Sequence, residues 1–241
     1  MWQWIHKTAS PRTTYRLAAL LQPWLGFLCV VFIGYGLFDG LLFAPSDYQQ
    51  GDVFRIMYLH VPAAIWSLGV YVAMSMAVII FLIWKIKVAD IIAKASAPIG
   101  ALFTVICLLT GAIWGRPTWG TWWIWDARLT SELLLLFIYF GIIALRSAIP
   151  NKELSARVSG IFVLIGLVNI PIIHYSVNWW NTLHQGASLS LTNANIAPSM
   201  LHPLLAMIFG FLFYYAWGMC IKVRSELLVR EQKASWIKGV I

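Results

Sequence analysis

The chain has few charged residues. Only 11% of its 241 residues are Asp, Glu, Lys or Arg, whereas 61% are hydrophobic and the mean hydropathy is +0.78. A soluble domain typically carries about 25% charged residues. The composition therefore excludes a soluble globular domain and predicts an integral membrane protein.

Cysteine pairs and common catalytic motifs are also absent. Cys29, Cys107 and Cys220 all lie within or beside apolar runs, and no CxxC or CxxCH occurs. This excludes a dithiol redox pair and covalent attachment of c-type haem, so we expect buried single thiols. No P-loop, HExxH or GxSxG motif is present, which removes the usual signs of an ATPase, a zinc protease or a hydrolase. With no obvious nucleophile or acid–base pair, we do not expect an enzyme.

What the chain does contain is six apolar runs of spanning length. They cover approximately residues 20–38, 62–84, 98–114, 129–146, 158–176 and 203–221. A helix needs about 20 residues to cross the hydrocarbon core of a bilayer, and a helical bundle satisfies all backbone polar groups in lipid. We therefore predict a single all-α domain over residues 1–241, built as a bundle of six transmembrane helices in the lipid bilayer.

Basic residues alternate between the predicted loops. All but three of the 17 lie in the two terminal tails and in the loops 85–97 and 146–157. The other loops hold only Arg55, Arg116 and Arg128. By the positive-inside rule, both termini are cytoplasmic and these three arginines face outward. The net charge of +8 is thus a topology signal, and we expect no nucleic-acid partner.

The segment 114–128 stands out in the second outward loop. Its sequence WGRPTWGTWWIWDAR holds five of the fourteen tryptophans, and Gly115 and Pro117 interrupt its start. These two residues predict that the preceding helix ends there. The bland interpretation of the tryptophans is an aromatic belt at the membrane surface.

A second interpretation depends on local conformation. If residues 119–126 form a helix, three indoles and one carboxylate share one face: Trp119, Trp122, Trp123 and Asp126. Trp125 then points elsewhere. Such a face is a platform for a large, flat, apolar molecule, and the residues alone leave belt and platform equally open.

Four of the five histidines lie in or beside the outward loops. They are His60, His174, His184 and His202. His60 precedes Pro62 by two residues, which suits the first turn of a helix. His184 follows Trp180 by four, so a helix there would place an imidazole beside an indole. A single such histidine is usually a local hydrogen-bonding residue, and the spacing does not say which two of the four could bind a metal.

Three motifs together resemble a known family. Residues 119–132, WGTWWIWDARLTSE, resemble the tryptophan-rich WWD signature of the haem-handling protein superfamily that serves cytochrome c maturation. Residues 58–66 and 171–186, with the length and the six helices, resemble its haem exporter protein C (CcmC) family. The resemblance covers nearly the whole chain.

The resemblance implies a site and a role. Haem b would be held non-covalently at the periplasmic face of the bacterial inner membrane, with axial histidines that match His60 and His184. The protein would deliver this haem to the periplasmic haem chaperone CcmE, working with the ATP-binding transporter CcmA–CcmB and the small membrane protein CcmD. The expected site residues are His60, His184, Trp114, Trp119, Trp122, Trp123, Trp125, Asp126, Arg128 and Trp180.

Haem propionates need cations, and the outward side offers few. Arg128 is the first candidate, with Arg55 and Arg116 behind it, although Arg128 could equally pair with Asp126 or Glu132. Asp126 itself could orient a ligand histidine, accept a hydrogen bond from an indole, or face the partner protein. The sequence does not rank these three roles.

Two other functions stay open at this point. A membrane b-type cytochrome electron carrier commonly pairs histidines inside the bilayer, often around two haems, whereas the histidines here crowd one side. A haem permease should carry polar or broken-helix features at mid-depth. The apolar runs here are nearly devoid of charge, which counts against transport by this chain alone.

Overall fold

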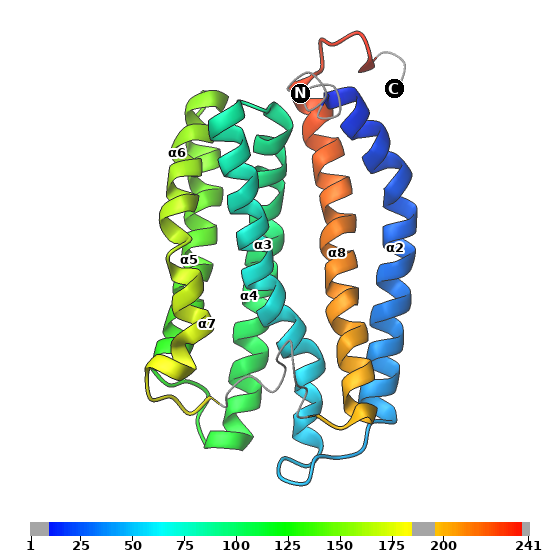
Figure 1. Ribbon diagram of the computed structural model, residues 1–241, viewed down its shortest axis with the longest axis vertical. Helices are drawn as coiled ribbons and strands as arrows, with labels where there is room; N and C mark the ends of the chain where they lie inside the picture. Colours follow the sequence, from blue (N-terminus) through cyan, green and yellow to red (C-terminus); the bar gives the residue numbers. More distant parts are fainter. Residues whose placement is uncertain (1–9, 185–195, 238–241) are drawn as a thin grey trace.

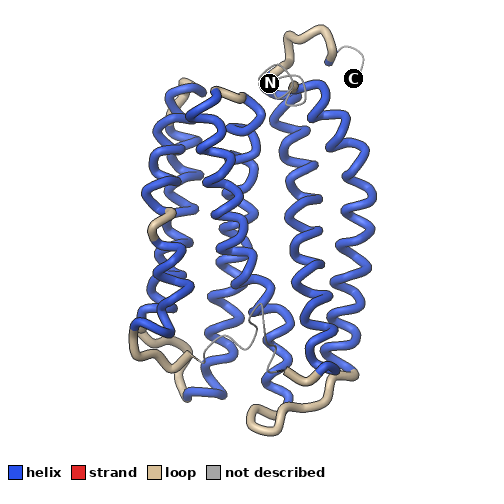
Figure 2. Tube along the Cα trace, viewed as in Figure 1, coloured by secondary structure: helices blue, strands red, loops and turns tan. Residues whose placement is uncertain are grey.

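The computed structural model describes residues 10–184 and 196–237. Over these ranges the chain is helical and contains no strand, as Figure 2 shows, and six helical stretches are long and apolar enough to cross a membrane. The prediction of an all-α, six-span membrane protein is confirmed.

The helices extend beyond the apolar runs. In chain order they are α2 (Pro11–Leu42), the 3₁₀ helix η1 (Asp52–Ile56), α3 (Met57–Trp84), α4 (Lys87–Trp119), α5 (Ala127–Ala148), α6 (Lys152–Gly166), α7 (Asn169–Trp179) and α8 (Pro198–Arg230). Capping residues explain several of the new boundaries, because Ser10, Asp126 and Asn151 each accept a hydrogen bond from a backbone N–H in the first turn of the helix that follows.

The fifth predicted span, 158–176, is one run of sequence but two helices. α6 ends at Gly166 and α7 begins at Asn169, and the interruption is visible in Figure 2. A Cβ at Gly166 would lie only 2.2 Å from the Tyr71 hydroxyl oxygen, and that hydroxyl donates to the Val163 carbonyl at 2.8 Å. The Tyr71 hydroxyl thus occupies the space that a side chain at position 166 would need, and it donates a hydrogen bond to a carbonyl near the break.

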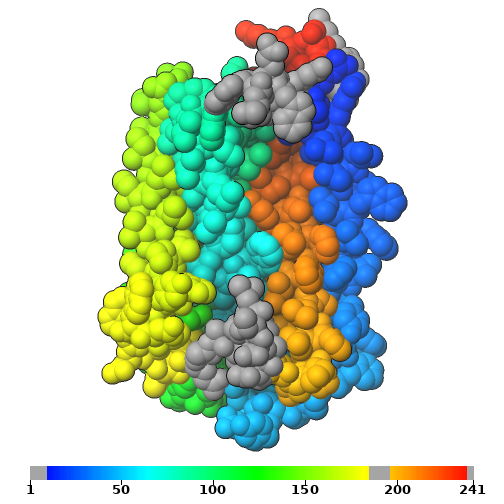
Figure 3. Space-filling model, viewed as in Figure 1, coloured from blue at the N-terminus to red at the C-terminus, as the bar shows by residue number. Residues whose placement is uncertain are grey.

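The helices fall into two groups that pack against each other. α2 and α8 lie side by side along their length, and α3 to α7 form the rest of the bundle (Figure 1). Side chains of α3 and α8 meet along the face shown in Figure 3. Within the larger group, Gly100 has no side chain where Tyr139 crosses α4, and the Tyr139 hydroxyl donates to the Ser67 carbonyl at 2.8 Å. These contacts join α3, α4 and α5 into one core.

The two ends of the bundle differ in what they carry. α2 begins and α8 ends at one end, which we call the terminal end (Figure 1). The loop after α2, the residues 120–126 and the end of α7 lie at the opposite end, which we call the loop end. An even number of spans requires this arrangement, and it brings the tryptophan-rich segment to the same end as the start of α3.

Candidate functional site

The tryptophan-rich segment is only half helical. α4 continues through Gly115 and Pro117 as far as Trp119, and residues 120–126 are not helical. The condition for a single indole face, a helix over 119–126, is therefore not met, and the expected end of the preceding helix near Gly115 is wrong. Pro117 lies in the last turn, where its missing N–H removes only one backbone hydrogen bond. Gly120 then ends α4 in the left-handed conformation, with φ 81°.

The tryptophans consequently form two groups instead of one face. Trp114 and Trp119 belong to the last turns of α4, whereas the other three lie on the loop that follows. Trp123 is half-buried, and its ring centre lies 5.5 Å from that of Trp125. Trp122 and Trp125 are 58% and 77% exposed. Indoles this exposed form an apolar surface that a ligand, a partner or the membrane can cover.

His60 sits in the first turn of α3, as predicted, and contacts α4. Its Nδ1 lies 3.0 Å from the Cys107 carbonyl oxygen and 3.1 Å from the Thr110 hydroxyl. A carbonyl only accepts, so Nδ1 carries the proton and Nε2 has a free lone pair. The ring also meets Trp114 edge to face, with centres 5.6 Å apart. α4 thus holds the imidazole in the tautomer that binds a metal through Nε2.

Gly111 makes the close approach of His60 possible. A Cβ at position 111 would lie 3.0 Å from Cε1 of the imidazole. Trp114, one turn further along α4, is held in turn by a hydrogen bond from its Nε1 to the Gln50 side-chain oxygen at 2.7 Å. The loop after α2 therefore helps to fix the indole against which His60 packs.

His184 lies in the loop after α7, and side chains from that loop and from α5 position it. The Thr182 hydroxyl donates to Oδ2 of Asp126 and accepts from the His184 backbone N–H at 3.1 Å. Asp126 uses its other oxygen to accept from the Leu129 N–H at 2.8 Å, which caps α5. The ring of His184 lies beside Trp119, with centres 4.8 Å apart. Both histidines therefore pack against the final turns of α4.

The ring nitrogens of His184 are not used within the described part of the chain. Nδ1 lies 3.9 Å from Asp126 Oδ2, too far for a hydrogen bond, and it is buried without a partner there. Burial and the nearby charge of Arg128 lower the pKa of His184 to about 4, and the carboxylate of Asp126 only partly opposes them. The imidazole is therefore neutral at pH 7 and able to act as a metal ligand.

The structure distinguishes between the roles left open for Asp126. Its two carboxylate oxygens accept from Leu129 and Thr182, so it connects the start of α5 to the loop that carries His184. The indole N–H of Trp123 is buried and finds no acceptor among the described residues. Of the three roles, support of a ligand histidine through Thr182 is the one that the contacts match.

The three outward arginines differ in the hydrogen-bond partners of their side chains. Arg55 donates to the Gly40 carbonyl at 2.7 Å and pairs with Asp52 at 3.2 Å. Arg116 donates to the Gly120 carbonyl. Arg128 makes no side-chain hydrogen bond or ion pair within residues 10–184 and 196–237. The alternative of a local ion pair with Asp126 or Glu132 is not observed there, so the guanidinium of Arg128 has no hydrogen-bonded partner among the described residues.

Glu132 has a structural partner instead. It lies in the second turn of α5, is 6% exposed, and accepts from the Ser67 hydroxyl at 2.8 Å. This contact joins α3 to α5 one turn below the site.

The remaining candidates lie further out. α7 ends at Trp179, so Trp180 and His184 do not share the helical face that their spacing would allow. Trp180 is 49% exposed and contacts Trp179 edge to face at 5.7 Å. His174 and His202 are both exposed. Residues 185–186, the end of the third motif, lie outside the described residues.

Several contributing residues had no recognisable signal in the sequence. Thr182, Thr110, Gln50 and the Cys107 carbonyl all hold site residues that are distant along the chain. Only the proximity of Thr182 to His184 could have suggested one of them. Within the described ranges no three His, Cys, Asp or Glu side chains gather as a metal cluster.

The fold and the site define a multi-pass helical membrane protein that presents two imidazoles and a group of indoles at one end of its bundle. A family model described as "Heme exporter protein C" (CcmC) matches residues 4–238. "Heme exporter protein C" of Haemophilus influenzae is 53% identical over the whole of this chain and 98% of its own length. The Escherichia coli K12 protein of the same name is 50% identical with the same coverage, and that of Bradyrhizobium diazoefficiens is 44% identical over 94% of this chain and 86% of its own. The chain belongs to the Heme exporter protein C family.

Proposed function

We propose that this protein binds haem b non-covalently at the loop end of its bundle, with His60 and His184 as the two axial ligands. The observation that carries the proposal is the state of the two imidazoles. His60 donates from Nδ1 to Cys107 and so presents Nε2, and His184 is held neutral beside Trp119. Two neutral imidazoles without further protein donors suit the axial positions of a haem iron.

The surrounding residues supply what the rest of a haem needs. The exposed rings of Trp122, Trp125 and Trp180 can cover an apolar macrocycle. Arg128 is the cation that can pair with a propionate, because Arg55 and Arg116 have local partners. When bound, haem would supply the iron to which both imidazoles bind. This chain orients the two histidines and limits the access of water to the site.

Delivery of the haem is the second part of the proposal. The names of the relatives support a role in haem export, and the family resemblance makes the periplasmic chaperone CcmE the recipient, with CcmA–CcmB and CcmD as further partners. The site residues include no nucleophile with an adjacent base, so transfer proceeds by exchange of iron ligands and needs no catalysis by this chain. His184 is the more exchangeable ligand, because a loop holds it through Thr182, whereas His60 belongs to a helix.

The same proposal sets the location. Placement in the bacterial inner membrane with the loop end in the periplasm is supported by the basic residues, which gather in the tails and loops of the terminal end. Among the described residues, one pair of histidines meets α4, which disfavours a two-haem electron carrier. The break between α6 and α7 is a feature that a permease would share, but Asn169 next to it donates to the Ser131 carbonyl at 2.9 Å, so the break is packed and partnered.

Absorption spectroscopy of the detergent-purified protein tests the proposal. Under haem-replete conditions we expect a low-spin Soret spectrum from the wild type, and its loss in the His60→Ala/His184→Ala double variant. His174→Ala is the matched control, since this exposed histidine belongs to α7, the helix that ends at the loop end. A wild type that carries no haem would sink the function, and a double variant with the wild-type spectrum would sink the ligand assignment.

A further inference from the structure

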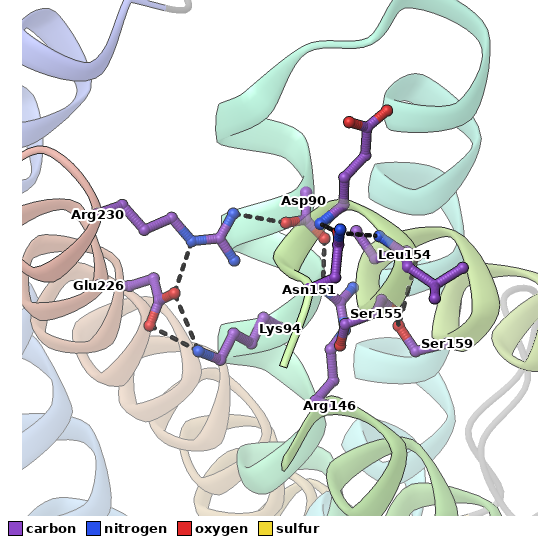
Figure 4. A network of polar contacts seen from close by, with 11 residues as sticks. Asp90, Lys94, Arg146, Asn151, Leu154, Ser155, Ser159, Glu226 and Arg230 are labelled. Carbon is purple, nitrogen blue, oxygen red and sulfur yellow. Dashed lines mark hydrogen bonds and ion pairs between the residues drawn. The ribbon is translucent and has the colours of Figure 1, made fainter. Parts of the chain in front are cut away.

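Figure 4 shows a charged network between the start of α4 and the ends of α5 and α8, which lie at the terminal end of the bundle. Asp90, in the first turn of α4, accepts from Arg146 Nη1 at 2.5 Å and from Arg230 Nη1 at 2.6 Å. Arg230 Nε donates to Glu226 at 2.6 Å, and Lys94 Nζ lies 2.8 Å and 2.9 Å from the two oxygens of Glu226. The network joins the ends of α4, α5 and α8.

The charges of this network do not cancel. Three basic side chains face two carboxylates, which leaves one positive charge in excess. Asp90 and Arg146 are only 3% and 7% exposed, whereas Lys94 is 41% exposed, so water screens the inner part of the network weakly and the outer part more strongly. A buried ionic cluster is costly unless every charge is compensated. An additional anion would balance the excess positive charge of this cluster.

A hollow of about 220 Å³ adjoins the network. Glu226 and two serines line it together with four basic residues: Lys94, Arg146, Lys152 and Arg230. Lys152 is the first residue of α6, so the positive end of that helix dipole also faces this region. Ile149 and Pro150 add an apolar part to the wall. The hollow therefore combines positive charge with an apolar side.

Arg146 provides an independent sign of a missing acceptor. Its side chain lines the hollow, yet its Nε is buried and makes no hydrogen bond within the described part of the chain. A buried donor without a partner costs about 1–3 kcal/mol. Arg146 already gives Nη1 to Asp90, so an acceptor for Nε has to come from outside these residues.

We propose that this hollow binds a phosphate group, supplied by the headgroup of an anionic phospholipid from the leaflet at the terminal end. The hollow lies among helix ends, the depth at which headgroup phosphates are found, and basic pockets between transmembrane helices suit anionic headgroups. The basic side chains that line the hollow attract the phosphate, Lys152 adds charge at the rim, and Ile149 and Pro150 contact the apolar part of the lipid. This site is independent of the proposed haem site.

Lipid binding to the delipidated, full-length protein tests the proposal, with native mass spectrometry as the readout. Phosphatidylglycerol and phosphatidylcholine with identical acyl chains are titrated separately. We expect phosphatidylglycerol to bind the wild type preferentially, and Lys152→Gln to weaken it about fivefold at low salt. Lys152 is chosen because it lies outside the ion-pair network, so its replacement leaves Asp90 and Glu226 paired.

Arg157→Gln is the matched control. It removes the same charge from the same helix, but Arg157 pairs with Glu153 and does not line this hollow. Equal binding of the two lipids, or equal losses in Lys152→Gln and Arg157→Gln, would overturn the proposal. Thermal stabilisation by inorganic phosphate alone, sensitive to Lys152→Gln, would support the phosphate site and make solution its source. The Soret spectrum should be unchanged in both variants, which separates this outcome from the fate of the haem proposal.

Discussion

Thr182 donates its hydroxyl proton to Asp126 while accepting a hydrogen bond from the backbone of His184. One threonine thus connects the last residue of the tryptophan-rich loop to a loop 56 residues further along the chain. Because Asp126 also caps α5, the position of His184 is tied to the start of a transmembrane helix. The loop that carries this histidine is therefore oriented by a rigid element.

Removal of the Thr182 hydroxyl should loosen His184. Thr182→Val keeps the shape of the side chain and loses both hydrogen bonds, each worth about 1 kcal/mol. We expect haem affinity to fall about tenfold, with part of the spectrum shifting from low-spin to high-spin as one ligand is lost. Thr118→Val is the control, because the Thr118 hydroxyl bonds only within α4, to the Trp114 carbonyl. Identical spectra for the two variants would contradict the role of Thr182.

A methyl group at Gly111 should displace His60. The new Cβ would lie 3.0 Å from the imidazole, which Cys107 and Thr110 of the same helix hold through its Nδ1. We expect Gly111→Ala to reduce haem occupancy markedly, as measured by the ratio of Soret to protein absorbance. Gly34→Ala should leave occupancy unchanged, since nothing lies within 4 Å of a Cβ at that helical position. Full occupancy in Gly111→Ala would argue that His60 is not held as rigidly as its contacts indicate.

Arg128 should contribute to haem affinity through a propionate. Charge-assisted hydrogen bonds contribute about 1.5–3 kcal/mol, so Arg128→Gln should weaken haem binding at least tenfold. Haem dimethyl ester, which lacks the propionate charges, should bind the variant and the wild type alike. Arg116→Gln is the control, because Arg116 is engaged with Gly120. An equal loss for haem and its ester would show that Arg128 acts on the fold instead.

The haem-free protein should lose stability in acid through His184. Its pKa is lowered from 6.5 to about 4 in the folded state, so folding favours the neutral ring. The neutral ring's contribution to the free energy of unfolding is complete above pH 6.5. About 3 kcal/mol of it is lost in total as the pH falls toward 4. We expect the thermal midpoint of the wild type to fall more steeply than that of His184→Gln between pH 7 and pH 4. Parallel pH profiles would mean that His184 titrates normally.

The positions of the helices were largely predictable, whereas their ends and the fifth span were not. A spanning apolar run indicates its own hydrocarbon core, but Ser10 and Asn151 extend α2 and α6 through polar caps that hydropathy does not register. The space for a side chain at Gly166, beside the break, is occupied by Tyr71, almost 100 residues earlier. A contact across that distance leaves no trace in local sequence.

The candidate site, too, was predictable from the sequence only in part. His60 lies in the first turn of a helix, as Pro62 suggested, and His184 and the tryptophans were recognised from motifs. The helical face considered over 119–126 does not form, because Pro117 near the end of α4 costs little, while Gly120 ends the helix later than Gly115 suggested. The described contacts matched only one of three roles for Asp126, which depended on where Thr182 lies.

The amino-acid sequence by itself determined that this is a six-span helical membrane protein and which residue types gather toward one side of it. Composition, the spacing of apolar runs and the placement of basic residues are properties of the chain alone, so they required no coordinates. Only the tertiary structure decided that His60 and His184 both pack against the end of α4. It also decided that, among the described residues, Arg128 has no ion-pair partner and Nε of Arg146 has no acceptor. These relationships depend on contacts between residues far apart along the chain, and those contacts exist only once the helices have packed.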